Sequence, residues 1–365
     1  MTTLPKTMKA MVLMRHGDLD ALEYHTDWPV PVPTGGEVLI RVTACGLNNT
    51  DVNTRTGWYS KTVDAATTGG SYENVDNHDP SWGGAPISFP RIQGADAVGI
   101  VVACGPDADA ELIGKRVMTD NWLRDWDNPM DRDATGYFGS ECDGGFAEFV
   151  TLDQRNVSVV DSPMTDAELA TFSCSYSTAE GMLSRANVGS NDRVLITGAS
   201  GGVGSALIQL AKRRGAMVVA MASEAKHDEV RALGPDAVLP RNPANLKVAL
   251  KEATGHDNVT VVADIVGGDI FPTLIDVLAR GGRYTCSGAI AGPIVSLDLR
   301  TLYLRDLTFT GSTVLPPYIF TDLVGYIERG EVRPLLAATY PLADLQAAQT
   351  AFIIKKHTGN IVVTL

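Results

Sequence analysis

The sequence predicts an α/β protein with two parts: a strand-dense, partly open β-barrel and a doubly wound parallel sheet. In residues 8–160, β-rich runs such as EVLIRVTA and AVGIVVAC alternate with Pro and Gly at tight turns. In residues 165–310, strand patterns alternate with helical ones, as in RVLITG, GVGSALIQLAKRRG and MVVAMAS. Such alternation is typical of parallel strands joined by crossover helices. A helix, YIFTDLVGYIERG, and a strand, GNIVVTL, follow from about residue 315, and this strand is able to rejoin the barrel.

Length, charge and cysteine usage narrow the class of protein. The 365 residues suffice for about two domains, and an apolar content of 44% supplies a core for each. A net charge of −13 argues against nucleic acid and anionic membranes as partners. The sequence has neither the apolar segment of a signal peptide nor a run near the roughly 20 residues of a membrane helix. The five cysteines are widely spaced and form no C-x-x-C pair, so we expect free thiols and a cytoplasmic protein.

The strongest chemical signal is the segment VLITGASGGVG. An apolar strand runs into a glycine-rich turn and then into a helix, which is the context of a dinucleotide-binding βαβ unit. Gly201 permits the tight turn, Gly202 admits a pyrophosphate, and Gly204 allows the helix to pack closely on the strand. The helix N-terminus then faces the phosphates, so Ser200 and Val203 complete the predicted phosphate loop. An ordinary tight turn between strand and helix is the alternative.

The end of the next strand decides which nicotinamide cofactor fits. An acidic residue there would hold the ribose 2′-hydroxyl of NAD, but residues 221–222 are Met and Ala. Ser223 and Lys226 instead offer a hydroxyl and a cation, and Arg241 follows the next strand. These groups suit the 2′-phosphate of NADPH, which we therefore expect as the cofactor. In the alternative interpretation, Lys226 and Arg241 are solvated charges and Glu224 is the acid, displaced by a residue or two.

Four segments carry a resemblance to a known family: PVPTGGEVLIRVTACGLN, GADAVGIVVACG, LITGASGGVGSALIQLAK and LDLRTLYLRDLTFTGST. In this order they resemble the medium-chain dehydrogenase/reductase superfamily over nearly the whole chain. The resemblance implies a GroES-like catalytic domain at residues 1–160 and 315–365, a Rossmann NADPH-binding domain at 161–314, a small-molecule substrate and a homodimer. Further residues expected beside the cofactor, at a family position next to the nicotinamide or after later strands, are Thr178, Val266 and Gly288.

The stretch CGLNNTDVNTRTGWY indicates which branch of the superfamily the chain resembles. Its pattern of Gly-x-Asn-x-x-Asp, followed by Arg, Gly and Tyr, is similar to that of the zinc-free quinone oxidoreductases. Zinc-dependent alcohol dehydrogenases carry Cys and His where this chain has Asn48 and Asn49, and a second His at the position of Ala95. Cys174 alone falls at a ligand position, and one thiolate cannot hold a catalytic zinc. The resemblance therefore implies no metal, and Cys174 is expected to be a small buried hydrophobe.

Asn48, Asp51 and Tyr59 are the candidate catalytic residues. We expect the Asn48 amide to polarise a substrate carbonyl in place of zinc, and Tyr59 or water to deliver a proton to the α-carbon. Each residue also has a structural interpretation. Asn48 suits the cap of a helix that starts near Thr50, Asp51 and Arg55 suit an ion pair on the helix surface, and Tyr59 suits a packed aromatic.

Two long segments, residues 60–90 and 119–145, show no periodicity. Long irregular loops in compact domains are usually functional or disordered. The first directly follows the candidate site, so we expect it to act as a substrate lid. The second stands where the zinc-dependent relatives have a structural zinc lobe, and its aromatic residues either serve function or form a satellite core.

These observations predict an NADPH-dependent, zinc-independent oxidoreductase. It would transfer hydride to the C=C bond of an α,β-unsaturated carbonyl or to a quinone. One alternative is an alcohol or carbonyl dehydrogenase on the same scaffold, with an unconventional metal at Cys174 and Asp96. A nucleotide-binding protein without turnover is the other alternative.

Overall fold

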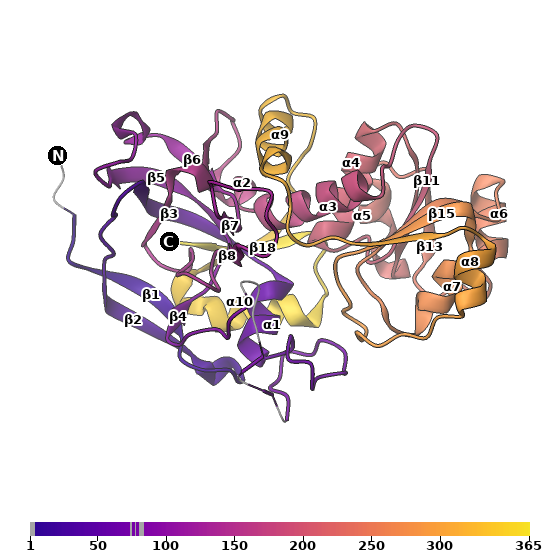
Figure 1. The fold of residues 1–365 in the computed structure, drawn as a ribbon, viewed down its shortest axis with the longest axis horizontal. Helices are drawn as coiled ribbons and strands as arrows, with labels where there is room; N and C mark the ends of the chain where they lie inside the picture. Colours follow the sequence, from indigo (N-terminus) through magenta and orange to yellow (C-terminus); the bar gives the residue numbers. More distant parts are fainter. Residues whose placement is uncertain (1–3, 74, 77, 80–83) are drawn as a thin grey trace. The chain divides into compact units, whose positions relative to one another are not determined.

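The structure is a computed structural model that describes the chain outside residues 1–3, 74, 77 and 80–83. The described residues form two compact units (Figure 1). The barrel unit has the bounds Met1–Val63, Thr68–Cys174 and Pro316–Leu365, and the Rossmann unit has the bounds Asp64–Thr67 and Ser175–Leu315. The GroES-like catalytic domain expected at 1–160 with 315–365 and the NADPH-binding domain expected at 161–314 stay predictions. In the described parts of the chain, no helix is long and apolar enough to cross a membrane.

Most strands of the barrel unit pair in antiparallel fashion. Among the described residues its largest sheet has the order β10-β6-β5-β3-β18-β17, with β9 also paired to β3. The last strand, β18, pairs with β3 so that Ile361 lies opposite Leu47, and the chain end thus rejoins the barrel as the sequence suggested. The strands are β1 (Thr7–Leu13), β2 (Leu22–Pro29), β3 (Glu37–Leu47), β4 (Arg91–Ile92), β5 (Asp96–Cys104), β6 (Arg116–Thr119), β7 (Trp122–Arg124), β8 (Thr135–Tyr137), β9 (Phe149–Asp153), β10 (Val157–Val159), β17 (Leu336–Pro341) and β18 (Asn360–Thr364). The helices are α1 (Asn49–Thr56), α2 (Asp166–Leu169), α9 (Pro317–Glu328) and α10 (Leu345–Ile354).

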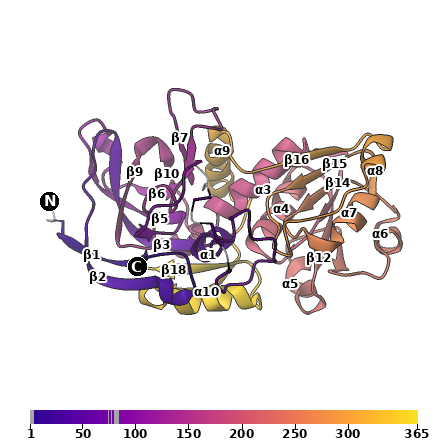
Figure 2. The ribbon, with the colours of Figure 1, turned by 60° about the horizontal axis from the view of Figure 1, so that its bottom comes forward.

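The Rossmann unit is built on a six-stranded sheet in its described residues, with the order β13-β12-β11-β14-β15-β16 and every pair parallel. This is the strand order of a doubly wound dinucleotide-binding fold, so the predicted fold class is confirmed (Figure 2). The strands are β11 (Arg193–Ile196), β12 (Met217–Ala222), β13 (Ala237–Pro240), β14 (Val259–Asp264), β15 (Leu278–Cys286) and β16 (Thr308–Gly311). The helices are α3 (Ser173–Arg185), which starts in the barrel unit, α4 (Gly202–Arg213), α5 (His227–Arg231), α6 (Leu246–Thr254), α7 (Phe271–Asp276) and α8 (Leu299–Leu304).

Each unit has its own apolar core. In the Rossmann unit, Val194, Leu195 and Ile196 of β11 are all fully buried, as expected for a central parallel strand covered on both faces. One face of that sheet packs against apolar residues of α6 and α7, such as Leu250 and Leu274. The barrel core gathers side chains from β1, β3, β5 and α10. These rigid frameworks position the polar side chains at the strand ends and on α1.

The two irregular segments differ in structure. Residues 119–145 are not structureless, because β7 and β8 form a hairpin and Trp122 packs edge-on against Tyr137 at 5.1 Å between ring centroids. Phe138 beside them is fully buried and packs into the main barrel core, whereas Trp126 lines a pocket, so a separate satellite core stays a prediction. Residues 60–90 contain neither helix nor strand in their described parts.

Candidate functional site

Helix α1 carries the first group of predicted site residues and begins as the sequence pattern indicates. Asn48 is its N-cap residue, and the Asp51 carboxylate accepts a hydrogen bond of 2.7 Å from the Asn48 backbone N–H. This pairing satisfies one of the free N–H groups at the helix start. Gly57, with φ of 76°, ends the helix in the left-handed conformation that glycine tolerates. Asn48 and Asp51 therefore form a capping box at the helix start, as the cap interpretation expects, and the Asn48 amide nitrogen has a separate partner.

Asp51 and Arg55 do not form the expected surface pair, because both are buried. Asp51 also accepts from the backbone N–H of Gly94, and burial raises its pKa to about 7. Arg55 donates instead to Gln349 Oε1 and to the backbone oxygens of Gly17 and Gly69. Arg55 thus ties α1 to α10 and to the segment that follows the candidate site. The prediction was wrong because a four-residue spacing does not reveal that α1 is enclosed on all sides.

A buried carboxylate organises the space next to Asn48. The Asn48 side-chain amide donates to Asp96 Oδ2 at 3.0 Å, while Asp96 Oδ1 accepts from the Asn121 amide at 3.1 Å and from the Cys174 backbone N–H at 2.9 Å. Tyr137 extends this group, since its hydroxyl donates to Cys174 Sγ at 3.3 Å. Burial raises the pKa of Asp96 to about 6, and these hydrogen bonds oppose the rise. We call these five residues the Asp96 cluster.

Tyr59 lies near this cluster at the end of the same chain segment. The Asn53 side chain hydrogen-bonds to its phenol, and burial of the phenol raises the pKa of Tyr59, with the nearby Asp51 carboxylate adding to the rise. Trp58 packs edge-on against the ring at 5.5 Å. Tyr59 is therefore a packed aromatic, as one expectation held. Its hydroxyl also stays protonated at neutral pH, which the proton-donor expectation requires.

A pocket of about 210 Å³ opens beside Tyr59 in the barrel unit. Half of its described lining comes from the 60–90 segment, and the rest comes from α1, its flanking turns and Ser140. The lining residues are His16, Asn53, Thr54, Gly57, Tyr59, Ser60, Lys61, Val75, Asp76, Asp79, Ile87 and Ser140. Sequence reasoning missed Asn53, which lies within CGLNNTDVNTRTGWY but outside its Gly-x-Asn-x-x-Asp pattern, and Ser140, which belongs to no motif.

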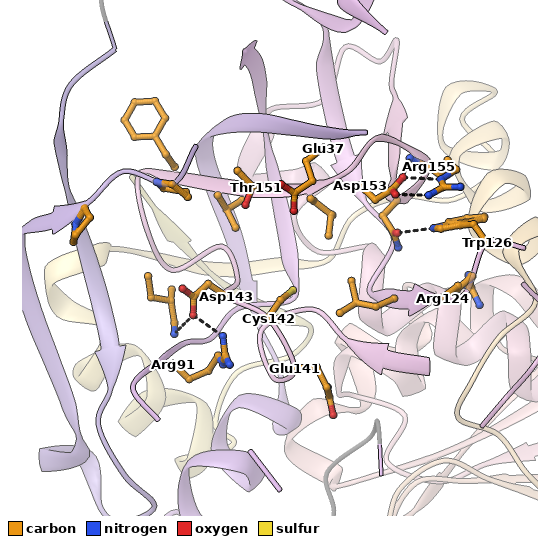
Figure 3. Close-up of a pocket in the computed structure, with 18 of the residues that line it drawn as sticks. Glu37, Arg91, Arg124, Trp126, Glu141, Cys142, Asp143, Thr151, Asp153 and Arg155 are labelled. Carbon is orange, nitrogen blue, oxygen red and sulfur yellow. Dashed lines mark hydrogen bonds and ion pairs between the residues drawn. The ribbon is translucent and has the colours of Figure 1, made fainter. Parts of the chain in front are cut away.

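A larger pocket, of about 700 Å³, lies elsewhere in the barrel unit and contains none of the predicted site residues (Figure 3). Its guanidinium groups are already paired: Arg91 with Asp143, Arg124 with Asp120, and Arg155 with Asp153. Arg124 and Arg155 also flank the Trp126 ring. Because its cations are internally neutralised, this pocket shows no preference for an anionic ligand.

In the Rossmann unit, the glycine-rich turn has the geometry of a phosphate loop. Gly198 has φ of 59°, and a Cβ at Gly204 would lie 2.2 Å from the Gly198 carbonyl oxygen, so the helix packs directly on the turn. Ser200, Gly201 and Val203 are partly exposed where α4 begins. These residues fit a dinucleotide, whose pyrophosphate would be held by backbone N–H groups at the helix start. Gly202 is the first residue of α4.

The residues expected to choose the cofactor lie at the ends of β12 and β13. Ser223 and Lys226 are partly buried, whereas Glu224 is exposed. Burial lowers the pKa of Lys226; the Arg241 charge lowers it further, and Glu229 opposes the shift. The two predicted cations therefore lie close enough to repel each other. An anion between them would relieve that repulsion.

Asp264, at the end of β14, is a site residue that the motif reasoning missed. It is fully buried and accepts from the hydroxyls of Thr197 (2.5 Å) and Tyr284 (2.7 Å) and from the backbone N–H of Val266 (2.9 Å). It thereby fixes the ends of three neighbouring strands at the edge where a dinucleotide binds. The acid ending the apolar run VTVVAD was the available signal. The two other expected cofactor residues are placed as follows: Thr178 is partly exposed on α3, and Gly288 follows β15.

Comparison with known proteins identifies the family. Residues 34–162 match the family described as Alcohol dehydrogenase GroES-like domain, and residues 202–329 match Zinc-binding dehydrogenase. A crystal structure from Sinorhizobium meliloti 1021, provisionally assigned as an alcohol dehydrogenase, is 45% identical with a TM-score of 0.89, and the match covers 100% of this chain and 98% of that one. The chain belongs to the medium-chain dehydrogenase/reductase superfamily.

Curated relatives match nearly the whole length of this chain. The quinone oxidoreductase of Mus musculus is 26% identical over 376 residues, covering 100% of both chains. Erythronolide synthase EryA2 of Saccharopolyspora erythraea is 29% identical over 371 residues, which is 99% of this chain but 9% of that protein. The chain is an oxidoreductase of the medium-chain dehydrogenase/reductase type. It matches a small part of the length of the synthase and the full length of the quinone oxidoreductase.

The superfamily includes zinc enzymes, so the donor set of this member was compared with the needs of zinc. A catalytic zinc normally has three protein ligands and an open position. Here Ala95 offers no donor, both Asp96 oxygens are occupied by hydrogen bonds, and Cys174 Sγ accepts from Tyr137. Across the described residues, no three His, Cys, Asp or Glu side chains gather to hold a metal ion. The Asp96 cluster therefore does not fit a zinc site.

Proposed function

We propose that the protein is an NADPH-dependent, zinc-independent reductase of α,β-unsaturated carbonyls or quinones. The observation that carries this proposal is the Asp96 cluster, in which the Asp96 oxygens and Cys174 Sγ, the atoms that would coordinate a metal, accept hydrogen bonds instead. Asp96 holds one hydrogen of the Asn48 amide and leaves the second for a substrate oxygen. Neutral donors of this kind stabilise a developing enolate oxygen.

The reaction is a hydride addition followed by a protonation. Bound NADPH supplies the hydride, which adds to the β-carbon while the C=C electron pair moves onto the carbonyl to give an enolate. The Asn48 amide binds the enolate oxygen. The α-carbon then takes a proton from the Tyr59 hydroxyl or from water, and the carbonyl reforms. Burial keeps the Tyr59 phenol protonated at neutral pH, so its hydroxyl would have a proton to give, and the Asn53 side chain would hold the phenol in place.

NADPH is the preferred cofactor in this proposal because of Lys226 and Arg241. Their mutual repulsion, together with the exposed position of Glu224, favours a ligand with a phosphate at the 2′-position. The phosphate loop from Ser200 to Gly204 would hold the pyrophosphate. Thr178, Val266 and Gly288 would contact the nicotinamide half.

We also propose a cytoplasmic homodimer with a small-molecule substrate. All five cysteines are free thiols, which suits a reducing compartment. Large apolar side chains are exposed on and before α8, next to the sheet edge formed by β16: Ile294, Val295, Leu299, Tyr303 and Leu304. A second copy covering this edge would bury them. A sedimentation mass of a single chain at micromolar concentration would contradict the dimer.

The test of the proposed function is steady-state turnover. We expect NADPH to be oxidised with enones or quinones, and expect no comparable NADP⁺-dependent oxidation of alcohols. Alcohol or carbonyl dehydrogenation is the second candidate, favoured by the 45% identity to the Sinorhizobium protein provisionally assigned as an alcohol dehydrogenase. Faster turnover of alcohols than of any enone would select it. Cofactor binding without turnover of any of these substrates would indicate a nucleotide-binding protein.

A further inference from the structure

Two residues that line the pocket beside Tyr59 each carry a buried polar atom without a hydrogen-bond partner among the described residues. These atoms are Asn53 Oδ1 and Ser140 Oγ, and the two residues are 6% and 2% exposed. A buried polar atom left unpaired costs free energy, so proteins usually pair it with protein, water or ligand. Other unpaired atoms occur in the described chain, such as Ser312 Oγ, but Asn53 and Ser140 stand out because they line the same cavity next to a candidate catalytic residue.

The Asn53 amide faces two ways. Its side chain hydrogen-bonds to the Tyr59 phenol, and because Oδ1 has no partner among the described residues, the NH₂ group makes that bond. Oδ1, a pure acceptor, is left unpaired. A ligand that pairs with Oδ1 must bring a hydrogen-bond donor.

The charges around the pocket exclude an anionic ligand group. In the described lining, Lys61 contributes one positive charge, and Asp76 and Asp79 contribute two carboxylates. The Asp79 carboxylate is held by the Ser60 hydroxyl at 2.5 Å and the Lys61 backbone N–H at 2.7 Å, and these bonds lower its pKa. His16 adds no positive charge, because burial lowers its pKa and its Nδ1 donates to the Thr54 carbonyl. The pocket is therefore neutral to acidic and suits an uncharged group.

The dimensions of the pocket limit the group further. Its volume of about 210 Å³ is below the roughly 300–1,000 Å³ of ordinary ligand pockets. Val75 and Ile87 supply apolar wall, and Ser60 fastens the segment by bonding to both Asp79 and the Asp76 backbone N–H. These hydrogen bonds hold Ser60, Asp76 and Asp79 together in the pocket wall. A compact ring or short chain fits, and a large acyl carrier does not.

We propose that this pocket selects enones or quinones whose compact, uncharged end carries a hydroxyl group, with Asn53 Oδ1 accepting from that hydroxyl and Ser140 Oγ as its second partner. The inference rests on the proposed function and names the substrate class of the same site. Since Asn53 also bonds to Tyr59, a bound hydroxyl would fix the amide and, through it, the phenol that faces the substrate. Recognition and protonation are thereby linked.

The test compares two probes that differ by one hydroxyl: 4-hydroxy-2-cyclohexen-1-one and 2-cyclohexen-1-one. We expect kcat/KM for the hydroxylated enone to be at least about tenfold higher, because a site built to bond a hydroxyl discriminates against the analogue that lacks it. Ser140→Ala should reduce this ratio several-fold, and Asn53→Leu should bring it close to one. Asn53→Asp, which keeps an acceptor, should retain more of the ratio than Asn53→Leu. Ser312→Ala removes an equally buried, unpaired hydroxyl in the Rossmann unit and should leave the ratio unchanged.

The outcomes separate this inference from the proposed function. Equal kcat/KM for the two enones in wild type would overturn the pocket assignment while leaving the reductase intact. If neither enone is reduced, the proposed function fails on these probes, and calorimetric titration with 4-hydroxycyclohexanone and cyclohexanone tests the pocket without turnover. Tighter binding of the hydroxylated ketone, weakened in Ser140→Ala, would support the pocket, and equal or undetectable binding of both would overturn it.

Discussion

The barrel unit contains two buried polar regions that differ in how many of their polar atoms have hydrogen-bond partners. In the Asp96 cluster, the side chains hydrogen-bond mainly to one another. Among the described residues, the side-chain Oδ1 of Asn121 is the buried atom of the cluster left unpaired. In the pocket beside Tyr59, Asn53 and Ser140 each keep an atom unpaired. The comparison indicates that hydrogen bonds close the first region almost completely, whereas the second keeps two polar atoms unpaired among the described residues.

The largest expected effect is on catalysis, at the residue of the Asp96 cluster that we propose to bind the substrate oxygen. Asn48→Ala should lower kcat by about ten- to a thousandfold, the range for loss of one oxyanion donor, with NADPH affinity nearly unchanged. Steady-state kinetics and cofactor titration on one preparation measure both quantities. Near-normal kcat with roughly 1 kcal/mol of lost stability would reduce Asn48 to a helix cap.

The second prediction compares deletion of a polar group in each region. Asp96→Ala should lower the free energy of unfolding by roughly 3 kcal/mol, because it leaves three buried donors without an acceptor. Ser140→Ala should leave the free energy of unfolding unchanged or slightly raised, because its hydroxyl has no partner to lose. Urea denaturation of both variants checks this contrast. Similar losses in the two variants would remove the distinction between closed cluster and open pocket.

Cofactor choice is expected to give the next largest effect. Lys226→Ala should weaken NADPH binding by roughly 1–3 kcal/mol, the scale of a charge-assisted hydrogen bond, and leave NADH binding almost unchanged. Lys247→Ala, at an exposed lysine of α6, is the matched control and should affect neither. Fluorescence titration of wild type and the two variants with both cofactors measures the six dissociation constants. Tighter binding of NADH than of NADPH by wild type would contradict the cofactor proposal.

The smallest effect concerns the pH dependence of stability. The pKa values of Asp51 and Asp96, about 7 and about 6, lie above the ordinary value of 3.8, so the folded state binds more protons than the unfolded state between these limits. Their contribution to stability is therefore complete below about pH 4 and is lost as pH rises through 6 to 7. Asp51→Asn lacks its share of this loss, so the stability advantage of wild type over the variant should shrink from pH 4 to pH 8 in urea titrations. An advantage that grows with pH would contradict the direction of the shift.

The sequence predicted the fold well because the fold depends on periodicity and glycine placement. The strand-turn-helix around Gly201 and the return of the last strand to the barrel both follow from such local patterns. The resemblance had already associated Asn48, Asp96 and Cys174 with one site, but Asn121 and Tyr137 were beyond prediction because only the fold brings residues 121–137 to Asp96 and Cys174. Arg55 was misjudged for the same reason, since its partners lie as far along the chain as Gln349.

The central claim is that hydrogen bonds have replaced the metal at the Asp96 cluster while hydride transfer to enones continues. The direct measurement is zinc content by mass spectrometry, combined with NADPH-dependent enone reduction on the same preparation before and after dialysis against a chelator. We predict far less than one zinc per chain and unchanged kcat/KM after dialysis. One tightly bound zinc per chain, with activity lost on its removal and restored on its return, would contradict the account.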